Sequence, residues 1–136
     1  MVTKELDFSS FERALNSLKK ALVRSQKQLG DEELRDACIQ RFEYSFELAW
    51  KMLKRQLEKD VGNSPEVDTY SKKSLFRVGA ERGLIKNVEP WFDYLERRNL
   101  TTHTYDPVHA EEVYSVIAAF VSDAEALLQK LKTCHD

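Results

Sequence analysis

The stretch that decides the fold is residues 31–62, which read DEELRDACIQRFEYSFELAWKMLKRQLEKDVG. Its apolar residues recur every three or four positions, the spacing of one helix face, at Leu34, Cys38, Phe42, Phe46, Ala49, Leu53 and Leu57. Asp31 is a favoured N-cap residue, and Glu32 and Glu33 suit the positive first turn of a helix. Gly62 and the Asn63-Ser64-Pro65 stretch close the element. The stretch therefore predicts one long amphipathic helix.

Two further long helices are predicted on either side of it. The first covers about residues 10–29, with a capping-box spacing at Ser9 and Glu12 and with Gly30 suited to end it. Its apolar face comprises Phe11, Leu15, Leu18, Leu22 and Leu29. The last helix opens at Asp106-Pro107, a strong start signal. Its heptad-like seam comprises Ala110, Tyr114, Ile117, Val121, Ala124, Leu128 and Leu131.

The middle of the chain is less regular and predicts short helices. Residues 71–82 form one that stops near Gly83, and residues 88–97 form another, capped by Asn87 and with Pro90 tolerated in its first turn. Three long helices plus one or two short ones indicate an all-α fold, an antiparallel up-and-down helical bundle.

The last helix is more apolar than one seam requires. Val113, Val116, Phe120 and Leu127 lie beside the seam and widen it. A stripe of this width either sits deep in the bundle or buries a second face against another subunit, most simply in a two-fold homodimer. The sequence leaves both alternatives open.

Length and composition bound the class of protein. The 136 residues fit a single helical domain spanning residues 1–136. The net charge of −2 argues against a bulk electrostatic grip on nucleic acid, so any such contact requires a local basic patch. The first ten residues lack the apolar region of a signal peptide, and no apolar run approaches the roughly 20 residues that span a bilayer. We therefore expect a soluble protein with no membrane association.

The cysteines and histidines point to neither a disulfide framework nor a metal centre. Cys38 falls in an apolar stripe and Cys134 near the C-terminus, so a reducing cytoplasm is the expected location. No histidine lies at ligand spacing from Cys38, and there is no glycine-rich phosphate loop. The sequence predicts no metal and no bound cofactor.

The segment best suited to chemistry is residues 97–107, RRNLTTHTYDP. Arginine offers a fixed fork of donors that matches a phosphate, and histidine transfers protons near neutral pH. The N-terminus of the last helix adds free N–H groups. Arg98 and His103 could therefore act on a phosphodiester without a metal. The alternative is structural, with Arg98 binding the last carbonyls of its own helix and His103 serving as a capping or surface residue.

Other charged residues have two interpretations each. Glu43 and Glu47 lie four residues apart, a pair that mildly destabilises an isolated helix. A positive group such as Arg98 could face Glu43, or Glu43 could be solvated; for Glu47 we favour an offset by Lys51. His109 is interpreted as an ordinary first-turn residue. The predicted helix at residues 71–82 carries a basic run. We interpret it as a solvent-exposed face rather than a surface that contacts RNA or an acidic partner. The run consists of Lys72, Lys73, Arg77 and Arg82.

Two motifs together resemble a known family. They are residues 40–51, QRFEYSFELAWK, and residues 98–105, RNLTTHTY. The chain resembles the HEPN superfamily, and within it the branch of nucleotidyltransferase substrate-binding proteins, over nearly its whole length. The resemblance implies a helical bundle that forms homodimers and binds a minimal nucleotidyltransferase encoded beside it, often as a toxin–antitoxin pair.

The resemblance also implies roles for particular residues. In many HEPN proteins an Arg-x4–6-His motif is a metal-independent ribonuclease site, and Arg98 and His103 match it. Asn99 matches the polar residue that often follows the arginine. Tyr105 matches a tyrosine that the partner modifies with AMP in some systems. Our hypothesis is therefore a toxin that cleaves RNA and is neutralised by its nucleotidyltransferase, with Glu43 supporting the site. The alternative is a non-catalytic substrate-binding subunit of a two-component nucleotidyltransferase.

Overall fold

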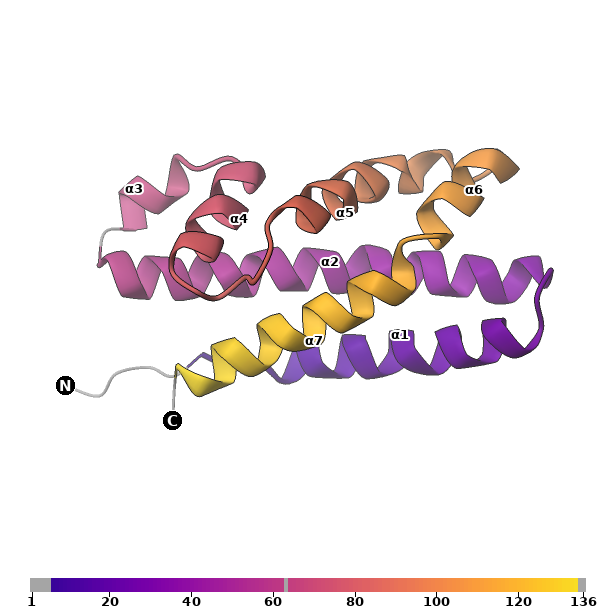
Figure 1. The fold of residues 1–136 in the computed structure, drawn as a ribbon, viewed down its shortest axis with the longest axis horizontal. Coiled ribbons are helices and arrows are strands. Elements are labelled where there is room, and N and C mark those ends of the chain that lie inside the picture. The colour runs from indigo at the N-terminus through magenta and orange to yellow at the C-terminus, as the bar shows by residue number, and fades with distance from the viewer. Residues whose placement is uncertain (1–5, 63, 135–136) are drawn as a thin grey trace.

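The computed structural model describes residues 6–62 and 64–134, and within these ranges every regular element is helical (Figure 1). The elements in chain order are α1 (Ser9–Lys27), α2 (Glu32–Val61), α3 (Ser64–Asp68), α4 (Lys72–Glu81), α5 (Glu89–Leu100), the 3-10 helix η1 (Thr101–His103), α6 (Pro107–Tyr114) and α7 (Ile117–Thr133). The helix α2 contacts every other element. The all-α bundle is confirmed, with more short helices than the sequence predicted.

The helix α2 forms as its sequence predicts. The Asp31 carboxylate accepts a hydrogen bond from the Leu34 amide at 3.1 Å, which satisfies one unpaired donor of the first turn. At the other end Gly62 has a φ of +70° and its amide donates to the carbonyl of Glu58. The predicted stripe is buried from Cys38 to Leu57. The predicted contribution of Asn63 to this end lies outside the described residues.

The boundaries of α1 differ from the prediction. The helix begins at Ser9 with Phe8 as N-cap, and the Ser9 amide donates to the Asp7 carboxylate at 2.9 Å. The predicted capping box between Ser9 and Glu12 is therefore wrong, because Ser9 is already inside the first turn. The helix ends at Lys27, and Leu29 is 83% exposed in the turn that leads to α2. Its assignment to the buried face is also wrong.

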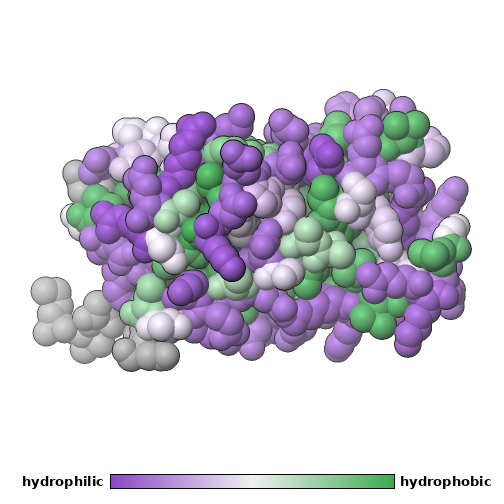
Figure 2. All heavy atoms as spheres, in the orientation of Figure 1, coloured by the Kyte–Doolittle hydropathy of each residue, from purple (hydrophilic) through white to green (hydrophobic). Residues whose placement is uncertain are grey.

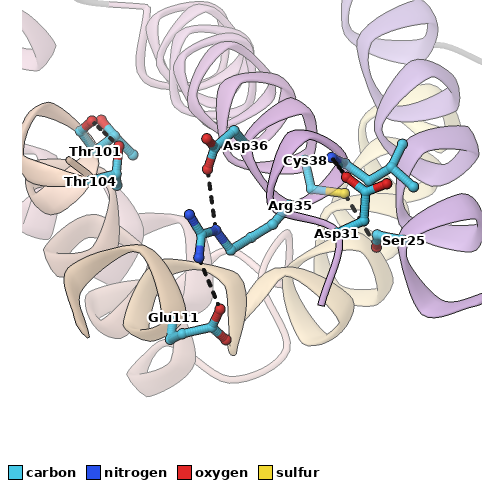
Figure 3. Close-up of polar contacts among 9 residues, drawn as sticks. Ser25, Asp31, Arg35, Asp36, Cys38, Thr101, Thr104 and Glu111 are labelled. Atoms are coloured by element: carbon cyan, nitrogen blue, oxygen red, sulfur yellow. Dashed lines mark hydrogen bonds and ion pairs between the residues drawn. The ribbon is translucent and has the colours of Figure 1, made fainter. Parts of the chain in front are cut away.

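The last predicted helix is two helices. After Tyr114 the chain passes through Ser115 and Val116 and restarts as α7, which runs in another direction (Figure 1). The break lets each part pack against a different neighbour. The helix α6 meets the start of α2 through an ion pair between Arg35 and Glu111 (Figure 3). The helix α7 runs beside α1, and two ion pairs, Lys19–Glu125 and Lys132–Glu12, join them.

The wide apolar stripe of this region is explained within one chain. Val113, Phe120 and Leu127 are at most 1% exposed, and Val116 packs against the same core. Of the two alternatives, burial in the bundle is therefore the one observed. A homodimer consequently takes no support from the width of this stripe.

The core is centred on aromatic rings from four helices. Phe42 of α2 and Phe120 of α7 meet edge to face with centroids 4.9 Å apart, and Phe76 of α4 lies 5.3 Å from Trp91 of α5. Such pairs add to the free energy gained by burying the rings themselves. The helix α4 approaches α2 closely at Gly79, where an added Cβ would lie 3.1 Å from a methyl group of Leu53.

The outer surface is mostly polar. Hydrophilic residues cover most of the face drawn in Figure 2, and the apolar residues on it lie in smaller groups. Among the described residues, no helix is long and apolar enough to cross a membrane.

Candidate active site

Arg98 lies in the last turn of α5 and reaches across to α2. Its Nε donates to Oε1 of Glu47 at 3.1 Å, and its Nη2 lies 3.6 Å from Oε1 of Glu43. Its Nη1 donates to Oγ1 of Thr101 at 3.2 Å. The suggested contact between Arg98 and Glu43 is therefore present. The preferred pairing of Glu47 with Lys51 is wrong, because the rotation of α5 against α2 brings a better donor to Glu47.

Glu47 uses both of its carboxylate oxygens. Oε1 accepts from Arg98, while Oε2 accepts from the indole Nε1 of Trp50 at 3.0 Å. The Glu47 side chain is 25% exposed and that of Arg98 is 22% exposed, so both are partly shielded from water. A carboxylate held at both oxygens fixes the guanidinium that binds it. Glu47 is therefore a positioning residue for Arg98 that sequence reasoning missed.

Two threonines shape the segment that follows. Thr101 is buried, and its hydroxyl donates to the carbonyl of Arg98 at 2.7 Å, where α5 passes into η1. The Thr104 hydroxyl donates to the Thr101 carbonyl at 3.3 Å, a contact drawn in Figure 3. These bonds satisfy carbonyls that the helix end leaves unpaired. They hold the turn that carries His103 in a defined conformation.

His103 is exposed at the end of η1. Its ring centroid lies 6.2 Å from that of Tyr105 and 6.4 Å from that of His109, and its carbonyl accepts from the Asp106 amide. The sequence interpretation treated His109 as an ordinary first-turn residue of the last helix. The structure places two imidazoles side by side, across the turn that Asp106 and Pro107 make.

The start of α6 differs from what the sequence suggested. Its N-terminus was expected to offer free N–H groups to a phosphate. Instead the Asp106 carboxylate accepts from the Val108 amide at 2.9 Å, and Pro107 has no N–H to offer. An anion would have to compete with a carboxylate already in place. This helix end is therefore no ready phosphate site.

The remaining predicted residues lie at the rim. Tyr105 is 86% exposed, so its phenol is accessible to solvent. Asn99 is exposed beside Arg98. Among the described residues, its side chain has no hydrogen bond or ion pair, so the structure does not bring it to the arginine. The described part of the chain also contains no group of three or more potential metal ligands.

A further contact fixes α5 from its other side. The Tyr94 hydroxyl donates to the Asp123 carboxylate of α7 at 2.5 Å. Burial, together with this hydrogen bond, raises the pKa of Tyr94 well above its ordinary value, so the phenol remains a donor. The helix that carries Arg98 is thus anchored both to α2 and to α7.

Comparison with known proteins places this arrangement in context. The profile of the family described as nucleotidyltransferase substrate binding protein like matches residues 6–133. The chain is 33% identical over 140 residues to a Haemophilus influenzae protein named probable ribonuclease HepT, and the match covers 97% of this chain and 96% of that protein.

Two solved structures share the fold. HI0074 from Haemophilus influenzae, described as having the fold of a substrate binding domain of a nucleotidyltransferase, superposes with a TM-score of 0.86 at 31% identity and covers 93% of this chain and 99% of its own. The Thermus thermophilus protein ttk003001694 superposes with a TM-score of 0.75 at 31% identity, covering 89% of this chain and 98% of its own.

Proposed function

The chain belongs to the family of nucleotidyltransferase substrate-binding proteins, and from this premise we propose that it is a HEPN-type ribonuclease that needs no metal. Arg98 and His103 are its catalytic residues. The supporting observation is that Glu47 and Thr101 hold the Arg98 guanidinium, while His103 stands exposed five residues further along the chain, at the end of η1. The name of the Haemophilus influenzae relative, probable ribonuclease HepT, agrees with this activity.

The chemistry follows from these two side chains. The 2′-hydroxyl of RNA loses its proton and attacks the adjacent phosphorus, and the bond to the 5′-oxygen breaks as that oxygen gains a proton. The products are a 2′,3′-cyclic phosphate and a free 5′-hydroxyl. His103 acts as general acid or base on one of these oxygens. Arg98 stabilises the charge that develops on the phosphate oxygens.

The test is RNA cleavage by the purified protein in EDTA. We expect wild-type protein to cleave single-stranded RNA and to leave 2′,3′-cyclic phosphate ends. His103→Ala should lower the rate by about 10²–10⁴-fold, the usual contribution of a general acid or base, without changing the helical circular dichroism spectrum. Cleavage that stops in EDTA, or that persists unchanged in the variant, would contradict the proposal.

The expected partner is a minimal nucleotidyltransferase that neutralises the toxin. We infer that it modifies Tyr105 with AMP: the phenol oxygen attacks the α-phosphorus of ATP bound by the nucleotidyltransferase, the phenol proton is lost and pyrophosphate leaves. Tyr105 suits this role because it is 86% exposed and its ring lies near that of His103. An attached AMP places a phosphate beside Arg98 and a base over the site, so charge and volume both exclude RNA.

Intact-mass spectrometry after co-expression with the nucleotidyltransferase tests this modification. We expect added AMP that maps to Tyr105 and is lost in Tyr105→Phe. Tyr44→Phe is the matched control, because Tyr44 is also exposed, at 38%, but lies on α2. If the co-expressed protein is non-toxic yet carries no added mass, inhibition works by complex formation alone.

A second candidate function is a non-catalytic subunit that presents substrate to the nucleotidyltransferase. Two carboxylates already face Arg98, which favours a structural role for it, and the description of HI0074 names a substrate binding domain. Expression of the chain alone separates the two. Growth arrest that depends on His103 favours the ribonuclease, whereas normal growth together with a stable complex favours the subunit.

The homodimer is also a proposal, carried by family membership. Light scattering should give twice the mass of the chain. A monomer at tens of micromolar, roughly where a modest interface still forms, would count against it.

A further inference from the structure

Four cations lie over two aromatic rings on the surface formed by α2, α4 and α5. The ammonium nitrogen of Lys72 is 4.9 Å from the ring centroid of Trp50, and that of Lys51 is 5.9 Å from it. Lys73 and Arg77, one turn apart on α4, lie 5.6 and 5.1 Å from the centroid of Phe92. We call these six residues the cation–aromatic strip.

The cations of the strip lack acidic partners. Within the described ranges, none of the four lies within 4.0 Å of a carboxylate, whereas Lys54 of α2 and Arg98 of α5 each contact two. Asp93 and Glu96 of α5 are exposed but do not pair with them. Lys72 and Lys73 also occupy the first turn of α4, which holds no acidic residue. Positive charge is unfavourable there because of the helix dipole, so the helix itself does not account for them.

The rings have one packed side and one available side. Trp50 and Phe92 are partly buried and pack against the hydrophobic core, so their positions are fixed. Flexible lysine and arginine side chains lie over both rings. A lysine can leave a ring at small cost, because an exposed cation–π contact is weak.

The strip adjoins the candidate active site directly. Trp50 donates its indole N–H to Glu47 at 3.0 Å, and Glu47 accepts from Arg98 at 3.1 Å. One carboxylate therefore separates the strip from the proposed catalytic arginine. A base stacked on Trp50 would therefore lie one side chain away from Arg98.

We propose that the cation–aromatic strip binds single-stranded RNA and guides it to Arg98 and His103. The proposal rests on the ribonuclease function proposed above. Bases stack on Trp50 and Phe92, and the lysines and Arg77 turn outward to the phosphates. Stacking rings combined with cations that follow the backbone is the usual means of binding single strands without sequence preference. An acidic protein partner would bind the cations but would gain little from two aromatic rings available for stacking.

The first experiment removes charge from the strip. The triple variant Lys72→Gln, Lys73→Gln, Arg77→Gln is compared with Lys20→Gln, Arg24→Gln, Lys27→Gln, which removes the same charge from exposed positions of α1. The probe is a 2′-O-methyl oligouridylate of about 12 nucleotides, which cannot be cleaved and suits a single-strand site. Binding is measured by anisotropy across a series of salt concentrations.

The strip variant should bind the probe at least about tenfold more weakly at 0.1 M salt and lower the salt slope by about 2, because three phosphate contacts are lost. The α1 variant should bind like wild type. Equal loss in both variants, or no loss in the strip variant, overturns the proposal. A strip variant that binds RNA normally but loses the nucleotidyltransferase also overturns it, and assigns the surface to a protein partner.

Tryptophan fluorescence gives an independent measurement. The chain has two tryptophans, and Trp91 is only 2% exposed while Trp50 is partly exposed. RNA stacked on Trp50 should quench the emission, and Trp50→Phe should abolish the quenching. Unchanged emission on saturation with RNA contradicts stacking.

These measurements separate the strip from the proposed ribonuclease. If RNA binding depends on the strip but wild-type protein does not cleave natural RNA, the ribonuclease proposal is wrong and the strip proposal stands. If the strip variant cleaves long RNA with the KM of the wild type, the strip proposal is wrong and the ribonuclease proposal stands.

Discussion

Arg35 and Arg98 each face two carboxylates, but the two clusters differ in the exposure of those carboxylates and in their surroundings. Arg35 of α2 lies between Asp36 and Glu111, whose side chains are 61% and 64% exposed (Figure 3). Arg98 of α5 lies between Glu43 and Glu47, which are 41% and 25% exposed, and an exposed imidazole follows it along the chain. The two arginine side chains are similarly shielded, at 15% exposed for Arg35 and 22% for Arg98, so the difference lies in the carboxylates and in the imidazole. An ion pair with an exposed carboxylate contributes little, whereas a guanidinium held by a shielded carboxylate is suited to stabilise a transition state.

The largest expected difference between the clusters is in catalysis. Arg98→Ala should lower the rate of RNA cleavage by about 10²–10³-fold, as for the loss of one oriented donor. Arg98→Lys should not restore it, because an ammonium group lacks the planar fork. Arg35→Ala, at the junction of α2 and α6, should cleave at the wild-type rate. Single-turnover kinetics measure all three, and equal losses in Arg35→Ala and Arg98→Ala would remove the distinction.

A smaller effect is expected from the carboxylates. Glu47→Gln keeps an acceptor for Trp50 but loses the charge that orients Arg98, so kcat should fall about tenfold through misplacement of the guanidinium. KM should not rise, because a negative charge beside the RNA is also removed. Glu111→Gln should change neither constant. A rise in KM with unchanged kcat would show that Glu47 serves binding rather than positioning.

Tyr94 also fixes the helix that carries Arg98, but through an uncharged phenol that donates a hydrogen bond to Asp123. Its pKa is raised in the folded chain, chiefly by burial and also by its bond to Asp123. Below pH 10 both states are protonated; above it the unfolded chain binds fewer protons, so the free energy of unfolding should fall with rising pH. The loss should reach about 1.4 kcal/mol by pH 11.

Urea unfolding of wild type and Tyr94→Phe at pH 8 and pH 11 measures this effect. The difference in stability between the two proteins should shrink as the pH rises. If it stays constant, the phenol does not remain protonated in the folded chain.

The smallest expected effects are on stability at neutral pH. A double-mutant cycle between Arg98 and Glu47 should give a coupling near the upper end of the range of about 0.2–1 kcal/mol for exposed pairs, and one between Arg35 and Glu111 near the lower end. The reason is the lower exposure of Glu47. Chemical denaturation measures both cycles. The reverse order would mean that exposure does not distinguish the clusters.

The helices themselves were predictable from local signals. Asp31 and Gly62 mark the ends of α2, and Ser71 caps α4 through the Ser74 amide. These contacts join residues close in sequence, so they can be predicted without knowing the tertiary structure. The errors also have local causes, as at Ser9, where Asp7 captured the first amide and shifted the start of α1.

The candidate site was only partly readable. The spacing of Arg98 and His103 is visible in the sequence, as is the apolar face that buries Phe42 and Phe46. The choice of Arg98 over Lys51 as the partner of Glu47 was not, nor was the approach of His109 to His103. Both depend on how helices distant in sequence are rotated against each other.

The sequence by itself thus determined an all-helical chain, the apolar face of α2 and the motif at the end of α5. Only the tertiary structure decided that the last predicted helix breaks at Ser115, that its wide apolar stripe is buried within one chain, and that one carboxylate, Glu47, links Arg98 to Trp50. The physical reason is the distance along the chain over which each kind of interaction acts. Helix periodicity and capping act over about four residues, whereas contacts between helices depend on the packing of the whole core.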